Sequence, residues 1–362
     1  MHSSDSLMPK KLNPKEKAVF DFIRINNGVS NSEIAEALEP QFGKLHRNTI
    51  VGYVDSLLEK NLVVREGAGG FDVRYSEKIP NPGYKSFDVE KYFGQPSDER
   101  EVRHPFFNPD VFSLMKRTFT DYELRKVEGL NNIYLETVRS CSPAQIKREM
   151  ERLTIELSWK SARIEGNTYS LIDTEVLLKQ NQEAKGHEKR EATEIINHKK
   201  AIDYVLENRG EFSELNLESI IKLHGILTAN LDIATGVRSG GVGIVGTNYR
   251  PLGSQADIEK ALRKFVELVN EIEQPIEKAF AAVMLTSYIQ PFFDGNKRTA
   301  RILGNGILLA HEMAPLSYRS VDEASYKKGI ILFYEQNSFR YFKELFIEQF
   351  KFSIGNYFSQ GA

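Results

Sequence analysis

An acid, a short flexible turn and two arginines stand close together between Ser287 and Leu303, directly before an apolar run. Asp294, Arg298 and Arg301 have the spacing i, i+4 and i+7, so a helix that begins near Gly295 would place both arginines on one face. The free N–H groups of its first turn and the helix dipole favour an anion at the same place. The stretch therefore predicts a polyphosphate site, with Asp294 available to Mg²⁺.

This stretch resembles the signature of the Fic (Fic/Doc) family, His-x-Phe-x-Asp/Glu-Gly-Asn-Gly-Arg-x-x-Arg. The matching residues are Phe292, Asp294, Gly295, Asn296, Arg298 and Arg301. The resemblance implies transfer of AMP from ATP to a Ser, Thr or Tyr hydroxyl, on a target protein or on the protein itself. It also implies that Asp294 holds Mg²⁺, that Asn296 and the N–H groups from Gly295 to Lys297 contact phosphate oxygens, and that Arg298 and Arg301 neutralise the phosphate charge.

Two residues differ from the family pattern: Gln290 stands in place of the histidine, and Lys297 in place of the second glycine. The histidine would remove the proton of the target hydroxyl, whereas an amide has no group that titrates near neutrality. General-base assistance accelerates a reaction by about 10²–10⁴-fold, so we expect weak or absent transfer. Two alternatives stay open: a catalytically inactive, ATP-binding regulator that acts through DNA, and a Doc-like phosphotransferase, which Lys297 suggests.

An amphipathic helix is expected from about residue 143 to 165, with apolar residues at i, i+4, i+7 and i+11. It ends at Glu165, followed by Gly166, a residue typical of helix C-termini. A carboxylate is unfavourable there, so Glu165 should have a cationic partner. The segment resembles the Ser/Thr-x-x-x-Glu-Gly/Asn inhibitory motif of Fic proteins. That resemblance implies that Glu165 pairs with Arg301 and blocks the γ-phosphate position, with Ser161 one turn earlier.

A glycine-rich segment follows residue 235 and contains Gly241-Val242-Gly243-Ile244-Val245-Gly246. It matches G-x-G-x-x-G, but no strand-then-helix unit surrounds it, so a dinucleotide site is rejected. Alternation and a turn predict a β-hairpin instead. By the Fic resemblance this hairpin is the flap, in which Gly243, Ile244 and Val245 position the target by main-chain pairing.

The first 78 residues read as three helices and a hairpin, an order that resembles a winged helix-turn-helix. In such a domain the third helix would contact DNA through Arg47, Asn48 and Thr49, with Arg65 and Arg74 on the wing. The segment has eleven Lys and Arg against eleven Asp and Glu. Because this balance lacks the basic excess typical of DNA-binding domains, docking to a protein or to the neighbouring part of the chain stays open as the alternative.

The chain as a whole is therefore predicted to be mainly α: a winged helix-turn-helix domain over residues 1–78, a turn-rich linker over 79–107, and a Fic-type helical bundle with a β-hairpin flap over 108–362. Its 362 residues are 27% charged and 41% hydrophobic, with one cysteine. No apolar run reaches the ~18 residues of a membrane span, and no signal peptide is evident. We expect a cytoplasmic protein without a membrane partner. The aromatic residues after position 325 suit a core or a subunit contact, which leaves a homodimer open.

Overall fold

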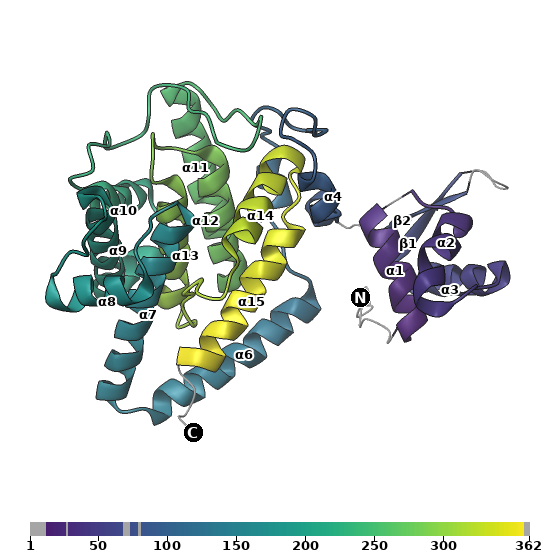
Figure 1. Cartoon of the computed structure of the whole chain (residues 1–362), viewed down its shortest axis with the longest axis horizontal. Coiled ribbons are helices and arrows are strands. Elements are labelled where there is room, and N and C mark those ends of the chain that lie inside the picture. Colours follow the sequence, from purple (N-terminus) through teal and green to yellow (C-terminus); the bar gives the residue numbers. More distant parts are fainter. Residues whose placement is uncertain (1–11, 27, 68–72, 79–80, 358–362) are drawn as a thin grey trace, which may run out of the picture. The chain divides into compact units, whose positions relative to one another are not determined.

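The structure is a computed structural model that describes residues 12–26, 28–67, 73–78 and 81–357. The chain divides into two units between Arg100 and Glu101, inside the segment expected to be a linker. Figure 1 labels the helices and strands. That segment contains local structure of its own, a 3₁₀ turn η2 (Pro82–Tyr84) and a short helix α4 (Val89–Phe93). Asp88 begins α4 by accepting a hydrogen bond from the backbone N–H of Lys91.

The N-terminal unit has the predicted order of three helices and two strands. These elements are α1 (Pro14–Asn26), α2 (Asn31–Phe42), α3 (Arg47–Glu59), β1 (Val63–Glu66) and β2 (Arg74–Glu77). The strands pair antiparallel, with Val63 opposite Glu77. Ser30 and Glu33 form a capping box at the start of α2. Residues 68–72, between the two strands of the predicted hairpin, lie outside the described residues.

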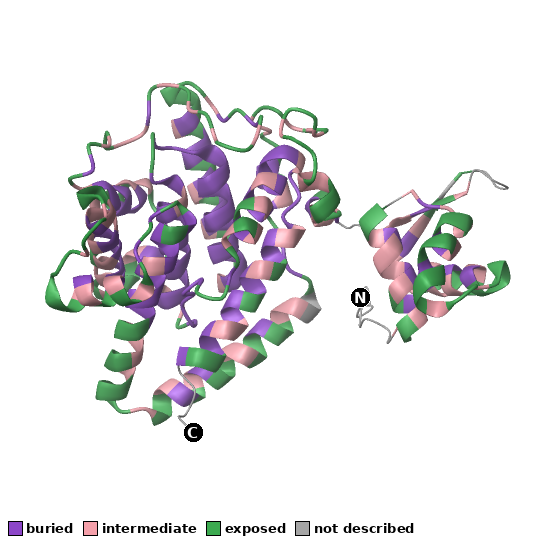
Figure 2. Cartoon of the chain, in the orientation of Figure 1, coloured by how far each residue is buried: buried purple, intermediate pink, exposed green. Residues whose placement is uncertain are grey.

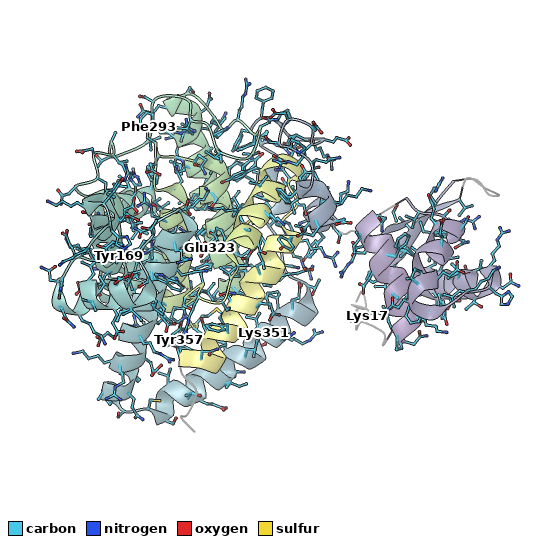
Figure 3. All side chains as sticks on the ribbon, viewed as in Figure 1. Lys17, Tyr169, Phe293, Glu323, Lys351 and Tyr357 are labelled. Atoms are coloured by element: carbon cyan, nitrogen blue, oxygen red, sulfur yellow. The ribbon has the colours of Figure 1, made fainter. Side chains whose placement is uncertain are left out.

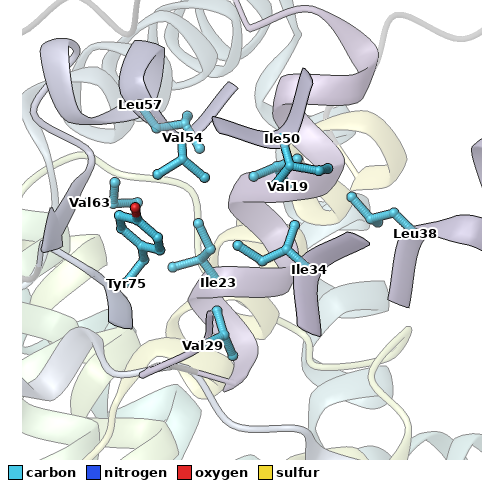
Figure 4. Close-up of a cluster of buried hydrophobic side chains, with 10 residues drawn as sticks. All are labelled: Val19, Ile23, Val29, Ile34, Leu38, Ile50, Val54, Leu57, Val63 and Tyr75. Atoms are coloured by element: carbon cyan, nitrogen blue, oxygen red, sulfur yellow. The ribbon is translucent and has the colours of Figure 1, made fainter. Parts of the chain in front are cut away.

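A separate hydrophobic core holds this unit together (Figure 4). The buried residues come from all three helices and both strands: Val19, Ile23, Val29, Ile34, Leu38, Ile50, Val54, Leu57, Val63 and Tyr75. A polar contact adds to it, because Glu16 on α1 accepts hydrogen bonds from Ser56 and Lys60 near the end of α3. These bonds, the one from Lys60 first, hold the pKa of Glu16 at about 2. The unit thus has a core of its own.

The larger unit is helical. It contains α5 (Val111–Leu114), α6 (Asp121–Ser140), α7 (Pro143–Ile164), α8 (Leu171–Gln180), α9 (Lys189–Glu207), η3 (Arg209–Phe212), α10 (Leu217–Thr228), α11 (Gln255–Glu271), α12 (Pro275–Ile289), α13 (Asn296–Ala310), α14 (Glu323–Gln336) and α15 (Arg340–Tyr357). The predicted helix at 143–165 is α7, with Ser142 as its N-cap. Within the described ranges, no helix is long and apolar enough to cross a membrane.

Helices α12 and α13 pack against each other at the centre of this unit. Figure 2 shows both as almost entirely buried. Two glycines of α13 allow its neighbours to approach closely. A Cβ at Gly304 would lie 2.6 Å from Cγ2 of Val283, and one at Gly306 would lie 2.7 Å from the ring of Phe212. The connection between α12 and α13 is therefore held between two buried helices.

The C-terminal aromatic residues belong mainly to the interior. Tyr334, Phe339, Phe342, Phe346 and Phe350 are each at most 1% exposed. The sequence left two alternatives for these aromatic residues, a core or a subunit contact, and their burial agrees with the core. It stabilises the packing of α14 and α15, because each fully buried Phe contributes on the order of 2 kcal/mol.

The glycine-rich segment differs in detail from its prediction. It turns at Val245 and Gly246, where a turn was expected, but its two arms form no ladder of paired strands. The predicted hairpin is thus an extended loop in this structure. Its glycines supply no side chains that could pack across the arms, and Val245 is 98% exposed. Without cross-strand side-chain contacts, a short isolated pair of strands gains little stability.

Candidate active site

The predicted anion loop is built as a tight connection between α12 and α13. Helix α12 ends at Ile289, and Gln290 takes the left-handed conformation with φ 51°. Gly295 is also left-handed, with φ 79°, and α13 begins at Asn296. The N–H groups of the first turn of α13 have no intrahelical acceptor. They are therefore the oriented donors that an anion requires.

The Asn296 side chain helps to close the loop. Its Nδ2 donates to the carbonyl oxygen of Phe292 at 2.8 Å, and its Oδ1 accepts from the Phe292 N–H at 2.9 Å. The side chain is buried, and these two bonds give its polar atoms partners. Because Nδ2 has a second N–H and Asn296 lines a cavity, its contact with phosphate oxygens stays a prediction.

His224 on α10 packs against the loop and holds its backbone. Its ring stacks on Phe292 at 3.7 Å between centroids and 9° between planes. Its Nε2–H donates to the carbonyl oxygen of Asp294 at 3.0 Å. Burial lowers the His224 pKa to about 4, so the neutral imidazole holds this contact near neutral pH.

Arg298 and Asp294 belong to a four-residue charge network with α9. Arg298 lies 3.4 Å from Asp294 and 3.3 Å from Glu194, and its side chain is 4% exposed. Arg190 on α9 approaches the same two carboxylates, at 3.3 and 3.4 Å. The Asp294 side chain is 52% exposed, so it faces open space while the arginines hold it in place.

Arg301 is fully enclosed by the end of helix α7. Its Nε donates to Ser161 Oγ at 2.7 Å, its Nη2 to the Ser161 carbonyl at 2.9 Å, and its Nη1 to Glu165 Oε1 at 2.9 Å. The ring of Tyr326 lies 5.2 Å from the guanidinium carbon. The predicted pair of Glu165 and Arg301 is therefore present, and each of the three guanidinium nitrogens donates a hydrogen bond.

Glu165 has a second cationic neighbour, Lys297, whose Nζ lies 3.5 Å from Oε2. Burial alone would raise the Glu165 pKa, but the charges of Arg301 and Lys297 outweigh it and lower the pKa. Gly166 leaves α7 at φ 107°, the left-handed conformation predicted for it. The carboxylate is thus ionised and directed at the start of α13.

The last turns of α7 are joined to α14 by Glu323, which Figure 3 labels. Lys160 and Arg163 contact its carboxylate at 3.2 and 2.8 Å. Both cations also lie near the ring of Trp159. These contacts fix the end of α7 and so fix the direction of Glu165.

A cavity of about 340 Å³ opens above the loop. Its walls bring together most of the predicted site residues: Glu165, Gly243, Ile244, Val245, Gln290, Asp294, Gly295, Asn296, Lys297 and Arg298. Arg301 and Ser161 are absent from the walls because both are fully buried behind Glu165. A cavity of this size suits a small molecule, and Glu165 lines it together with Lys297 and Arg298.

Residues 214–308 match the family model described as the Fic/DOC family. The chain contains a Fic/DOC family domain. The match includes the whole anion loop and helices α10 to α12, but neither α7 with Glu165 nor α14. The contact between Glu165 and Arg301 therefore joins the matched region to a helix outside it.

Similar proteins include the protein adenylyltransferase Fic of Nematostella vectensis, which is 28% identical over 186 residues, 50% of this chain and 43% of that protein. The Caenorhabditis elegans protein adenylyltransferase fic-1 is 27% identical over 200 residues, 53% of this chain and 38% of that protein. The chain thus spans less than half the length of these curated relatives.

Solved structures show that the fold is shared. A fragment of Fic-1 from C. elegans superposes with a TM-score of 0.56 at 24% identity, covering 65% of this chain and 70% of that one. A Fic domain containing signaling protein from Bacteroides thetaiotaomicron gives a TM-score of 0.55 at 19% identity, covering 64% of this chain and 96% of that one. The predicted Fic-type helical bundle is therefore confirmed.

Gln290 is held in one orientation within the Fic domain. Its Nε2 donates to the Ser287 carbonyl at 2.6 Å and to Tyr334 Oη at 3.0 Å. The carbonyl of Ser287 can only accept, so this contact fixes which end of the amide is the nitrogen. Both N–H groups are used, and the Oε1 acceptor is the polar atom left for a ligand. Arg238 fixes the backbone here, since its Nε donates to the Gln290 carbonyl at 2.6 Å.

Several residues of the Fic site were missed from the sequence. Arg190 and Glu194 lie on α9, while Tyr326, Ile330 and Tyr334 form one face of α14 at i, i+4 and i+8. The helical spacing of these residues is visible in the sequence, but the aromatic residues in this region were interpreted as part of a core or a subunit contact. No local signal marks Arg190, because it meets Asp294 across 104 positions of the chain.

Proposed function

We propose that the Fic domain transfers AMP from ATP to a protein hydroxyl and that Glu165 holds it inactive. The main observation that supports this proposal is the position of the Arg301 guanidinium. It is buried in the first turns of the anion-binding helix and is bound by Ser161 and Glu165. A guanidinium at this place suits a terminal phosphate, and the Glu165 carboxylate competes for it. The names of the similar adenylyltransferases support AMP as the transferred group.

Mg²⁺ is the metal that such a reaction requires, and Asp294 fits it. The carboxylate is a hard oxygen donor with its side chain 52% exposed. Mg²⁺ in nucleotide sites is held by one or two carboxylates and by substrate phosphates. The ion would neutralise phosphate charge when bound.

The residues of the chain would act as follows. The N–H groups of Asn296, Lys297 and Arg298 bind phosphate oxygens, and the Arg298 guanidinium stabilises negative charge there. The target hydroxyl oxygen forms a bond to the α-phosphorus, the bond from that phosphorus to the bridging oxygen breaks, and pyrophosphate leaves. Entry of the terminal phosphate requires Glu165 to move away from Arg301.

Gln290 limits this reaction, because its amide cannot accept the hydroxyl proton. With Oε1 as its remaining acceptor it can orient a hydroxyl by a hydrogen bond. The proton would leave to solvent or to phosphate. We expect turnover slower by about 10²–10⁴-fold than with a histidine at this position.

The test is intact-mass spectrometry after incubation with MgATP, on the natural chain and on the Gln290→His, Glu165→Gly double variant. A gain of one AMP on the double variant supports the proposal, and Arg298→Ala in the same background should abolish it. A gain of one phosphate would instead assign the Doc-like reaction. ATP binding without any mass gain would assign the role of an inactive regulator.

A second function, DNA binding, is proposed for the N-terminal unit. The supporting observation is that Arg47, Asn48 and Thr49 at the start of α3 are all exposed. Arg65 on β1 is exposed as well, whereas Arg74 is paired with Glu33 at 2.5 Å. We therefore expect weak, salt-dependent binding through α3 and Arg65.

The measurement is fluorescence anisotropy with duplex DNA over a range of salt concentrations, comparing Arg47→Ala, Asn48→Ala with the control Arg24→Ala on α1. Loss of binding in the double variant alone supports DNA binding by α3. Equal binding in all variants would refute it. A change of DNA affinity on addition of MgATP would link the two units in a regulatory role.

A further inference from the structure

A second cavity, of about 850 Å³, adjoins the active site. One wall is a face of α9 with Lys189, Thr193, Ile196 and Lys200 at i, i+4, i+7 and i+11. The other wall is the loop 230–233. Asp294 lines this cavity as well as the one above the anion loop. Whatever occupies the second cavity would therefore lie beside the reacting groups.

The walls of this cavity are fixed by hydrogen bonds. Asn197, which is 1% exposed, donates through Nδ2 to the carbonyl oxygens of Leu227 and Ala229 at 3.3 and 2.7 Å. This joins α9 to the start of the loop. Leu231 is 5% exposed and turns its side chain into the interior. The cavity is thus a feature of the folded domain.

The charges leave an excess of positive groups. Arg190 and Arg298 together balance Asp294 and Glu194, at distances of 3.3 to 3.4 Å. Lys189 and Lys200 are exposed and have no ion-pair partner in the part of the chain that the structure describes. The carboxylate left in the walls is that of Asp232. Two free cations therefore face one free carboxylate.

We propose that this cavity binds an acidic segment of the polypeptide that presents the hydroxyl, a partner recognised by Lys189 and Lys200 with apolar contacts to Ile196 and Ile233. The proposal rests on the transferase function proposed above. A wide cavity with apolar residues between its cations suits a peptide that carries acidic and apolar side chains. A free phosphate would leave those apolar residues unused. Negative charge near the modified hydroxyl would thus select the target.

The test uses a fluorescein-labelled peptide of repeated Glu-Ile-Ser and a matched Lys-Ile-Ser peptide, with anisotropy measured on the full chain. We expect the acidic peptide to bind more tightly, and Lys189→Ala, Lys200→Ala to weaken it about tenfold, as two exposed ion pairs would. The matched control is Lys199→Ala on the same helix, since Lys199 pairs with Asp203 at 2.5 Å and does not line the cavity. Raising the salt concentration above about 50 mM should weaken the binding of the acidic peptide.

Equal affinity for the two peptides, or an unchanged affinity in the double variant, would overturn the proposal. So would tighter binding of oligo-dT than of the acidic peptide with the same dependence on Lys189 and Lys200, since that result assigns the cavity to nucleic acid. Calorimetry with MgATP on the same variants, each also carrying Glu165→Gly, separates the two proposals. Absent ATP binding in the Glu165→Gly chain contradicts the transferase, whereas intact ATP binding with no peptide discrimination contradicts only the acidic-target proposal.

Discussion

The Glu165 carboxylate accepts a hydrogen bond of 2.9 Å from the guanidinium of Arg301, a residue 136 positions later in the chain. Arg301 is fully buried, whereas the Glu165 side chain is 23% exposed. The two groups therefore differ in their freedom to move. The Arg301 guanidinium is fixed in the interior, whereas the Glu165 carboxylate can move away from it because Glu165 stands at the end of α7, at the cavity wall. A phosphate that replaces Glu165 would meet an arginine already in position.

Removing this carboxylate's charge should favour ATP. For Glu165→Gln we expect MgATP to bind about tenfold more tightly, because the phosphate no longer competes with a negative group. We also expect the free energy of unfolding to fall by roughly 1–2 kcal/mol, since buried Arg301 loses part of its counter-charge. Calorimetry and urea denaturation measure the two effects.

The control for this change is Glu151→Gln, an exposed carboxylate on the same helix, 3.9 Å from Lys179. Glu151→Gln should measurably change neither the affinity for MgATP nor the free energy of unfolding. Unchanged ATP affinity in Glu165→Gln would remove the case for inhibition by this residue.

The anion loop could be predicted from the sequence because its chemistry is contiguous. Asp294, Gly295, Arg298 and Arg301 follow one another at helical spacing, and the helix starts where the glycine allows it. The Glu165 contact was predicted as well, but only through the resemblance to a family motif. Helical periodicity located α7 without indicating its partner.

The remaining features depend on contacts that no local pattern shows. Arg190 reaches Asp294, Tyr334 reaches Gln290, and Arg238 reaches the Gln290 backbone, all across more than forty positions. The two bonds between the Asn296 amide and the Phe292 backbone were likewise not predicted from the sequence. The glycine-rich segment was predicted to form paired strands from its alternation of residue types. Alternation alone does not provide the cross-strand side-chain contacts that stabilise such a pair.

Gly295 should be the least replaceable residue of the loop. Its φ of 79° disfavours any side chain, and a Cβ there would lie 3.2 Å from Thr228 Cγ2. We expect Gly295→Ala to lower the free energy of unfolding by about 1–3 kcal/mol and to weaken MgATP binding, because the first turn of α13 shifts. Gly253→Ala, where the added Cβ meets nothing within 4 Å, is the control. Equal stability of the two variants would contradict the strain argument.

His224 should make the protein sensitive to acid. Its pKa is about 4 in the folded protein, against an ordinary histidine value of 6.5 in the unfolded chain. The unfolded chain therefore binds more protons between these values, and stability falls as the pH decreases through this range. Between pH 7.5 and pH 5 the loss is about 2 kcal/mol. Buried His198, whose pKa is also lowered, acts in the same direction. Denaturation midpoints at several pH values measure the effect.

The matched variant is His224→Gln, which keeps an N–H donor for the Asp294 carbonyl and removes the titration. We expect a smaller loss of stability on acidification than in the natural chain, although His198 still contributes. An identical pH dependence in the two proteins would show that His224 does not titrate in this range.

Tyr334 should control what Gln290 can do. Its hydroxyl is the acceptor for one Gln290 N–H, so Tyr334→Phe leaves that group without a partner and should cost about 1 kcal/mol of stability. The amide then keeps only its bond to the Ser287 carbonyl, so Oε1 is held less firmly in the cavity. In the Glu165→Gly background we therefore expect less residual AMP transfer, at unchanged ATP affinity, measured by mass spectrometry and calorimetry.

The control for this last change is Tyr288→Phe. Tyr288 is equally buried in the same aromatic cluster, and its hydroxyl accepts from the Asn108 N–H at 2.9 Å. It should lose similar stability without affecting transfer, because it does not contact the Gln290 side chain through that hydroxyl. If both variants lose transfer equally, the effect belongs to packing of the cluster. If only Tyr334→Phe loses it, the Gln290 carbonyl is the group that orients the target hydroxyl.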